Sequence, residues 1–263
     1  MTFRMSEIEH LYGPNVHILN DPCLNTWLAR LCSPETFQPQ INYLVNFLYR
    51  GLLETVINAE FPRRKVRVPT RMTLQHPDVL LETEVLAEDT KVVTVNLARA
   101  GTYPSHICYE LLNNLVEPKN VRQDHILASR LTNETHQVTG AAMAGAKIGG
   151  DVEGALVLFP DPMGATGNTL NAALDLYKET IGGKAAKYIA LHLIVTPEYL
   201  KNVLSRHKDL IVYAIRLDRG LSHPNVLQAI PGARWDEEKG LNDHHYIVPG
   251  GGGFGEIMNN SFV

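Results

Sequence analysis

The sequence predicts an α/β fold in which a mainly parallel central sheet is flanked by helices. Continuous apolar runs, such as those at 91–98 and 155–159, are typical of strands buried on both faces. Segments with helical spacing alternate with these runs, and this alternation is typical of parallel sheets. Clusters of Gly, Pro and Thr separate the segments and predict turns between them.

The N-terminal third is expected to supply a long helix and an arm. Residues 1–35 are expected to be irregular and partly extended, with a short strand at 15–20. Residues 38–60 carry apolar side chains at helical spacing and predict a long amphipathic helix. The segments 65–72 and 79–87 predict two strands of a hairpin arm.

The middle of the chain predicts buried strands at 91–98, 124–131 and 155–159, with a helix over about 104–116. The Gly- and Ala-rich stretch at 139–150 is expected to be a loop or a flexible hood.

Strands at 187–195 and 209–218, with a helix at 196–207 between them, complete the prediction. Pro197 fits the first turn of that helix. We expect a single domain over 1–263, with the helix and arm at about 15–90 and the core at about 91–263.

Composition narrows the class of protein. The chain has 263 residues, 44% hydrophobic and 20% charged, with a net charge of −4, so we expect no nucleic-acid partner. No apolar run approaches the roughly 20 residues that span a bilayer, so we expect no membrane association. Three scattered cysteines predict no disulfide framework, and residues 1–10 lack the apolar core of a signal peptide. We therefore expect a cytoplasmic protein.

The first candidate site is the loop DPMGATGNT at 161–169, which follows a buried strand. Gly164 and Gly167 allow a ligand to approach the backbone closely, and free N–H groups before a helix bind anions. Asn168 or Thr169 is expected to cap that helix.

Asp161 is placed to bind hydroxyl groups or a metal-bound water at the start of the same loop. A loop that binds phosphate beside such an acid fits a ribose phosphate. An ordinary strand–turn–helix connection is the alternative. The loop is neither a Walker motif nor G-x-G-x-x-G.

The second and third candidates lie at 99–101 and 244–256. Arg99 follows the strand 91–98, where it would bind a phosphate bidentately; an exposed or acid-paired Arg is the alternative. The glycines at 250–253 suit a pocket wall that backs a flat ligand, beside Phe254. The adjacent residues His244 and His245 point in different directions, so a shared metal is not expected. His192 fits a hydrogen-bonded core or surface histidine better than a catalyst.

Three motifs in order resemble the uracil phosphoribosyltransferase family: ARAG at 98–101, DPMGATGNT at 161–169 and YIVPGGGGFGE at 246–256. The likeness extends from about residue 15 to 257. It implies a type I phosphoribosyltransferase-like fold with a β-arm and a C-terminal base-binding segment.

The resemblance also implies the reaction. The family transfers ribose 5-phosphate from phosphoribosyl pyrophosphate (PRPP) to uracil, which gives UMP and pyrophosphate in pyrimidine salvage. Mg²⁺ enters with PRPP, so no metal ligand of the protein is implied. Uracil and PRPP are the implied small-molecule partners, and a homodimer or larger homo-oligomer is the implied assembly.

The motif match assigns roles to individual residues, with Asp161 and Arg99 as the catalytic pair. The residues that it assigns to PRPP are Arg99, Ala100, Gly101, Arg130, Asp161, Pro162, Met163, Gly164, Ala165, Thr166, Gly167, Asn168 and Thr169. The residues that it assigns to uracil are Met163, Ala165, Tyr246, Ile247, Gly252, Gly253 and Phe254.

The chain departs from the family pattern at the site itself. Gly253 stands where the family has Asp, Glu256 and Ile257 replace its Asp-Arg pair, and Gly164 replaces a Leu. An additional segment at about 222–240 precedes the third motif. The alternative function is therefore a weak or inactive family member that binds PRPP, uracil or a nucleotide as a sensor or partner subunit; transfer to another base is a third possibility.

Overall fold

A computed structural model describes residues 3–132 and 138–261 of the chain. Its main sheet has the strand order β1-β10-β9-β7-β4-β5-β6, with β8 paired to β9. All pairings are parallel except that of β5 with β6. The mainly parallel α/β fold is therefore confirmed. The strands are β1 (Val16–Ile18), β4 (Val92–Ala98), β5 (Val121–Thr132), β6 (Val138–Lys147), β7 (Leu156–Pro160), β8 (Met163–Gly164), β9 (Lys187–Val195) and β10 (Leu210–Leu217).

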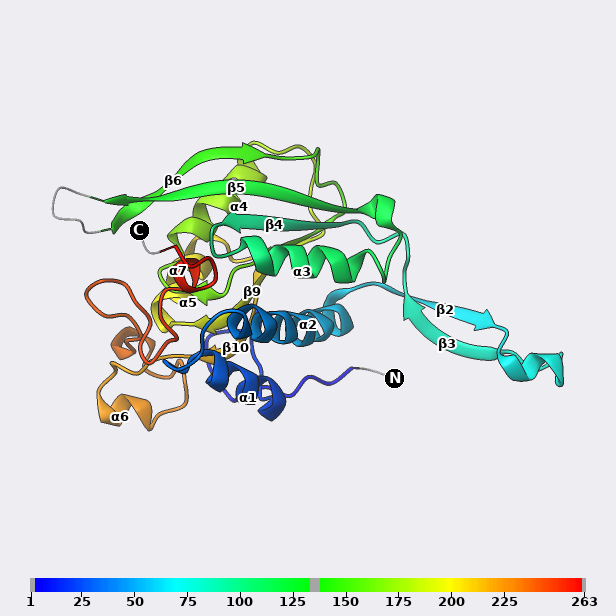
Figure 1. Ribbon diagram of the computed structural model, residues 1–263, viewed down its shortest axis with the longest axis horizontal. Coiled ribbons are helices and arrows are strands. Elements are labelled where there is room, and N and C mark those ends of the chain that lie inside the picture. Colours follow the sequence, from blue (N-terminus) through cyan, green and yellow to red (C-terminus); the bar gives the residue numbers. More distant parts are fainter. Residues whose placement is uncertain (1–2, 133–137, 262–263) are drawn as a thin grey trace.

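Helices cover both faces of this sheet, as Figure 1 shows. One core joins α1, α2 and α3 to alternate strand residues such as Leu158 and Leu191, and a second joins α4 and α5 to their neighbours Val157 and Ala190. This period of two is what a strand buried on both faces requires. The helices are α1 (Pro22–Leu31), α2 (Gln40–Glu60), α3 (Thr102–Leu112), α4 (Asn168–Glu179), α5 (Pro197–Arg206), α6 (Pro224–Leu227) and α7 (Phe254–Ile257), with 3₁₀ turns η1 (Arg71–Leu74), η2 (Pro118–Asn120) and η3 (Trp235–Glu237).

None of the helices in residues 3–132 and 138–261 combines the length and the apolar character needed to cross a membrane. The longest, α2 (Gln40–Glu60), buries nine side chains and leaves its other positions at the surface or partly covered.

Two parts of the prediction are wrong. Residues 1–35 contain a regular helix, α1, which Asp21 caps by accepting hydrogen bonds from the N–H groups of Cys23 and Leu24. The predicted loop at 139–150 is mostly strand β6, which pairs antiparallel with β5. Small residues gave β6 no hydrophobic signal, but strand pairing needs only backbone groups. In addition, α3 spans Thr102–Leu112, which is earlier and shorter than the expected 104–116.

The arm is confirmed. Strands β2 (Arg63–Val68) and β3 (Leu81–Leu86) pair antiparallel as a separate two-stranded sheet, and the turn η1 lies at its tip. Figure 1 shows the arm projecting away from the main sheet, on the side opposite α6 and α7.

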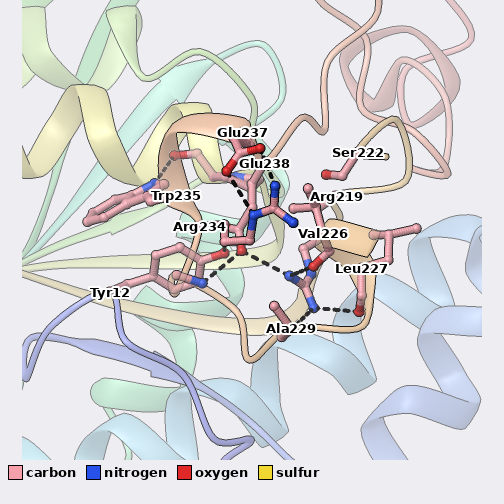
Figure 2. A network of polar contacts seen from close by, with 12 residues as sticks. Tyr12, Arg219, Ser222, Val226, Leu227, Ala229, Arg234, Trp235, Glu237 and Glu238 are labelled. Carbon is pink, nitrogen blue, oxygen red and sulfur yellow. Dashed lines mark hydrogen bonds and ion pairs between the residues drawn. The ribbon is translucent and has the colours of Figure 1, made fainter. Parts of the chain in front are cut away.

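The additional segment at 222–240 is held by a buried ion pair between Arg219 and Glu238, with 2.9 Å between Nη1 and Oε1 (Figure 2). Arg219 also donates to the carbonyl oxygens of Val226, Leu227 and Ala229. Glu238 in turn accepts hydrogen bonds from the Tyr12 hydroxyl and, at 2.8 Å, from the N–H of Gly232.

Burial and the hydrogen bond to Glu238 raise the pKa of the Tyr12 hydroxyl well above its usual value, so this hydroxyl stays protonated as a donor. The hydrogen bond between Tyr12 and Glu238 thus connects the segment to the residues before β1. The end of the segment lies against α5. There Glu198 accepts hydrogen bonds from the N–H groups of Gly240 and Leu241. The segment therefore fixes the point at which the third motif begins.

Candidate active site

A cavity of about 440 Å³ lies at the carboxyl ends of β4 and β7, where α/β folds bind ligands. Segments from all three motifs line it. The predicted site residues on its wall are Arg99, Ala100, Asp161, Met163, Ala165, Thr166, Gly167, Asn168, Thr169, Tyr246, Ile247, Gly252, Gly253 and Phe254. Side chains far apart in the sequence thus meet around one space.

The loop at 161–169 is held by hydrogen bonds from α5 and the residue before it. The N–H of Thr196 donates to the carbonyl oxygen of Gly164 at 3.1 Å, and its hydroxyl donates to that of Ala165 at 2.7 Å. The side-chain amide of Asn202 donates to the carbonyl oxygen of Thr166 at 2.7 Å. Three consecutive carbonyl oxygens are therefore tied to one side of the loop.

These ties set the direction of the backbone donors. In a trans peptide the N–H points opposite to the preceding C=O. The N–H groups of Thr166 and Gly167 are therefore directed away from Thr196 and Asn202. Such donors at the start of α4 make a site for an anion.

The start of α4 differs from the predicted cap. Gly167, with φ of 82°, occupies the N-cap position, and the helix begins at Asn168. The left-handed conformation at this point favours glycine. Asn168 and Thr169 lie in the first turn of the helix and are therefore not its cap residues. The side chain of Asn168 instead accepts a hydrogen bond from Asn202 at 3.0 Å.

Gly164 is a glycine because other side chains fill the space beside it. A Cβ at this position would lie 2.8 Å from Val195 Cγ1 and 3.2 Å from the ring of Tyr199. The ring of Tyr199 thus occupies the volume that a larger residue at 164 would need.

His192 and Tyr199 line the cavity beneath Asp161. The His192 ring is fully buried, with Nδ1 2.5 Å from the carbonyl oxygen of Asp161 and Nε2 2.5 Å from the Tyr199 hydroxyl. Burial lowers the pKa of His192 to about 4, although the bond to Asp161 opposes the shift. A neutral ring then donates from Nδ1 to Asp161 and accepts from Tyr199. The reading of His192 as a hydrogen-bonded core residue is confirmed, but it also forms part of the cavity wall.

Arg99 follows β4 and is 40% exposed. Its Nη1 donates to the carbonyl oxygen of Ser261 at 3.2 Å and to the Ser261 hydroxyl at 2.8 Å. Its Nη2 lies 3.7 Å from Oε1 of Glu256. The guanidinium is thus held at the cavity by the C-terminal segment.

The glycine-rich segment is anchored by Arg216 and Asp218 at the end of β10. The N–H of Gly250 donates to Asp218 Oδ2 at 2.7 Å, and its carbonyl oxygen accepts from Arg216 Nη2 at 2.8 Å. Arg216 and Asp218 also pair with each other, at 2.6 and 2.7 Å. Gly250 has φ of 59°, a conformation that favours glycine. Phe254 is buried in the core below the segment.

Three predicted site residues are not part of the cavity wall, and a fourth is not described. Gly101, Pro162 and Gly164 are set back from it. The side chain of Arg130, in β5, falls outside the described residues.

The wall also contains residues that the sequence analysis did not assign to a ligand: Leu97, Ala98, Leu170, His192, Tyr199, His245, Gly255 and Glu256. Glu256 had a signal, because it belongs to the third motif. No sequence motif pointed to Tyr199, because its position on the cavity wall depends on how α5 packs against the loop.

Comparison with known proteins places the chain among phosphoribosyltransferases. The family profile described as "Uracil phosphoribosyltransferase" matches residues 18–233. Relatives with that name include one from Variovorax paradoxus, 26% identical over 92% of this chain and 96% of the relative. Another, from Agrobacterium fabrum, is 30% identical over 71% of this chain and 75% of the relative.

Among solved structures, the AQ2163 protein from Aquifex aeolicus has a similar fold, with a TM-score of 0.68 and 20% identity over 92% of this chain and 97% of that one. The match over most of the sequence and the cavity lined by all three motifs lead to one conclusion. The chain belongs to the uracil phosphoribosyltransferase family.

Proposed function

We propose that the chain transfers the ribose 5-phosphate of PRPP to N1 of uracil, which yields UMP and pyrophosphate. The observation that carries this proposal is the convergence of Arg99, the loop 161–169 and the segment 246–256 on one cavity. Family membership and the names of the relatives support uracil as the base.

The loop supplies the phosphate site. The backbone and hydroxyl donors of residues 165–169 bind the 5-phosphate, and Asp161 accepts hydrogen bonds from the ribose hydroxyls. Arg99 binds the pyrophosphate with the adjoining backbone of Ala100. Arg130 is assigned to the same group through the family motif.

The glycine-rich segment supplies the base site. Backbone groups of Ile247, Gly252 and Phe254 bind the polar edge of uracil, and Tyr246 and Gly253 complete this wall. Met163 and Ala165, also on the cavity wall, border the ring of the base.

The donor set of the cavity fits Mg²⁺ that arrives with PRPP. Among the described residues no cluster of three or more His, Cys, Asp or Glu could hold a metal, and the acids on the cavity wall are Asp161 and Glu256. Mg²⁺ keeps several waters and is commonly bound by one or two carboxylates and substrate phosphates. When bound, it neutralises charge on the diphosphate.

The reaction breaks the bond between ribose C1 and the pyrophosphate oxygen, forms a bond from C1 to uracil N1, and releases the N1 proton, which the departing pyrophosphate accepts. Arg99 stabilises the negative charge that grows on the leaving group. The cavity walls hold the base in line with C1 and reduce the access of water to it.

We also propose a cytoplasmic homo-oligomer. Exposed apolar side chains on the arm, including Met72, Leu74, Val79 and Leu81, support an assembly through this element.

The test is UMP formation from labelled uracil, PRPP and Mg²⁺, with cytosine and other bases in parallel. We expect UMP and no comparable product from the other bases. Binding of PRPP without product from any base would refute the proposal and establish the binding protein instead.

A further inference from the structure

Gly253 is not a glycine for conformational reasons. Its φ of −83° and ψ of 95° describe extended backbone that any residue adopts. A Cβ at this position, however, would lie 2.2 Å from Oε2 and 3.0 Å from Cδ of Glu256. The carboxyl group of Glu256 therefore fills the volume into which a side chain at 253 would extend.

Glu256 lies in α7, one turn after Gly253, and its side chain is 23% exposed on the cavity wall. Its Oε1 lies 3.7 Å from Nη2 of Arg99, while Nη1 of the same guanidinium faces Ser261. One edge of Arg99 thus donates hydrogen bonds to Ser261, and the other faces the carboxylate of Glu256 at ion-pair distance.

We propose that Glu256 is a positioning residue whose carboxylate, in the space beside Gly253, acts on Arg99. It orients the guanidinium of Arg99 for the pyrophosphate group of PRPP. Bidentate binding of a phosphate requires a fixed guanidinium plane, so the location of the carboxylate controls the affinity for the donor. This inference rests on the proposed function, because it takes PRPP as the ligand.

The inference predicts that a carboxylate at residue 253 can replace the one at residue 256. In Glu256→Ala the carboxylate is lost, and PRPP should bind about tenfold more weakly, as expected for a charge-assisted contact. In Gly253→Asp two carboxylates compete for one space, and binding should weaken by a similar factor. In the double variant Gly253→Asp/Glu256→Ala a single acid returns to that space, and affinity should recover to within about threefold of wild type.

Calorimetric titration of PRPP with Mg²⁺ into the four proteins measures this pattern, with thermal unfolding to confirm that each one is folded. Glu256→Gln, which keeps the volume and removes the charge, should weaken binding like Glu256→Ala. In turnover assays KM for PRPP should rise with each single change, while KM for uracil stays within about twofold, because the effect passes through Arg99.

Normal PRPP affinity in Glu256→Ala or Glu256→Gln would overturn the inference, as would a double variant no better than Glu256→Ala. If wild type forms UMP but the variants bind normally, the inference fails and the proposed function stands. If the binding pattern holds but no UMP forms, the proposed function fails and the role of Glu256 stands. Absence of PRPP binding by the wild type would refute both.

Discussion

Asn202 tests whether α5 holds the phosphate loop in its binding conformation. In Asn202→Ala the loop loses two hydrogen bonds, to Thr166 O at 2.7 Å and to Asn168 Oδ1 at 3.0 Å. The buried amide of Asn171, which donates to Asn202 at 3.2 Å, loses its acceptor as well. At about 0.5–1.5 kcal/mol for each hydrogen bond, the free energy of unfolding should fall by about 2 kcal/mol. For a chain of this size that corresponds to a decrease in Tm of about 4–8 °C.

Asn202→Ala should also weaken the binding of PRPP more than the binding of uracil. With the carbonyl oxygen of Thr166 released, the following peptide can rotate, and the N–H of Gly167 is no longer preorganised. KM for PRPP should therefore rise about tenfold while KM for uracil changes little. Steady-state kinetics and thermal unfolding measure the two effects.

Asn114→Ala is the matched control. Its side-chain amide donates to the carbonyl oxygen of Glu110 at 2.8 Å on the exposed surface just beyond the C-terminal end of α3, away from the cavity. It should cost less than about 1 kcal/mol and leave both KM values unchanged. If Asn202→Ala is destabilised but binds PRPP as tightly as Asn114→Ala, the loop does not depend on this tie and the reasoning is refuted.

Three further changes test the site and the core. Thr166→Ile places a branched side chain in the phosphate loop and should weaken PRPP binding by more than about a hundredfold in calorimetry; unaltered binding would remove the loop from the site. Burial keeps His192 neutral between its unfolded pKa of 6.5 and its folded pKa of about 4, so stability is lost as pH falls through this window. His192→Asn should reduce that slope in denaturant unfolding, though not abolish it, because burial also lowers the pKa of His207; an unchanged slope would show that His192 does not contribute. Burial opposes ionisation of Glu60, but hydrogen bonds from Lys187 and Tyr213 outweigh burial and lower the Glu60 pKa. The resulting contribution to stability is complete above the unfolded pKa of 4.5 and is lost as pH falls through the lower folded pKa. Lys187→Met should therefore lower stability at neutral pH and flatten the acid side of the profile, and a profile like that of wild type would contradict this.

The sequence was sufficient to predict the family, the fold class and the convergence of the three motifs. Arg99 and Asp161 each follow an apolar run, and the ends of neighbouring parallel strands lie at one edge of a sheet. Local pattern and topology together therefore place these residues around one cavity. The division of the chain into a single domain stays a prediction.

The errors have local physical causes. The helix α1 follows Asp21-Pro22, a cap and first-turn signal, but only Leu24, Leu28 and Leu31 are buried in it. These three positions are four and three residues apart, which is helical spacing, so the sequence carried a signal for α1 that the prediction did not use. Strand β6 is rich in Ala and Gly, so its pairing with β5 has no signature in side-chain pattern.

The supporting residues of the site could not be predicted because their contacts depend on packing between distant segments. Thr196 and Asn202 reach the phosphate loop from the start and the interior of α5. Arg216 and Asp218 reach Gly250 from the end of β10. In each pair the side chain bonds to backbone groups more than 30 residues away, and the residue types that can do this are common everywhere in the sequence.

Gly164 and Gly253 lead to a different view of the departures from the family pattern. In the sequence, each glycine stands where the family pattern has a larger side chain. The missing Asp at 253 favours a binding protein without turnover. In the structure each glycine faces a side chain from elsewhere, Tyr199 at 164 and Glu256 at 253, that occupies the missing volume. Because interiors are close-packed, a gain at one position demands a loss at its neighbour. The buried side chains of Val195 and Tyr199 therefore account for Gly164. The contact at 253 is with the end of a flexible side chain, so an Asp there would displace the carboxylate of Glu256, and the variants at 253 and 256 test whether this departure affects turnover.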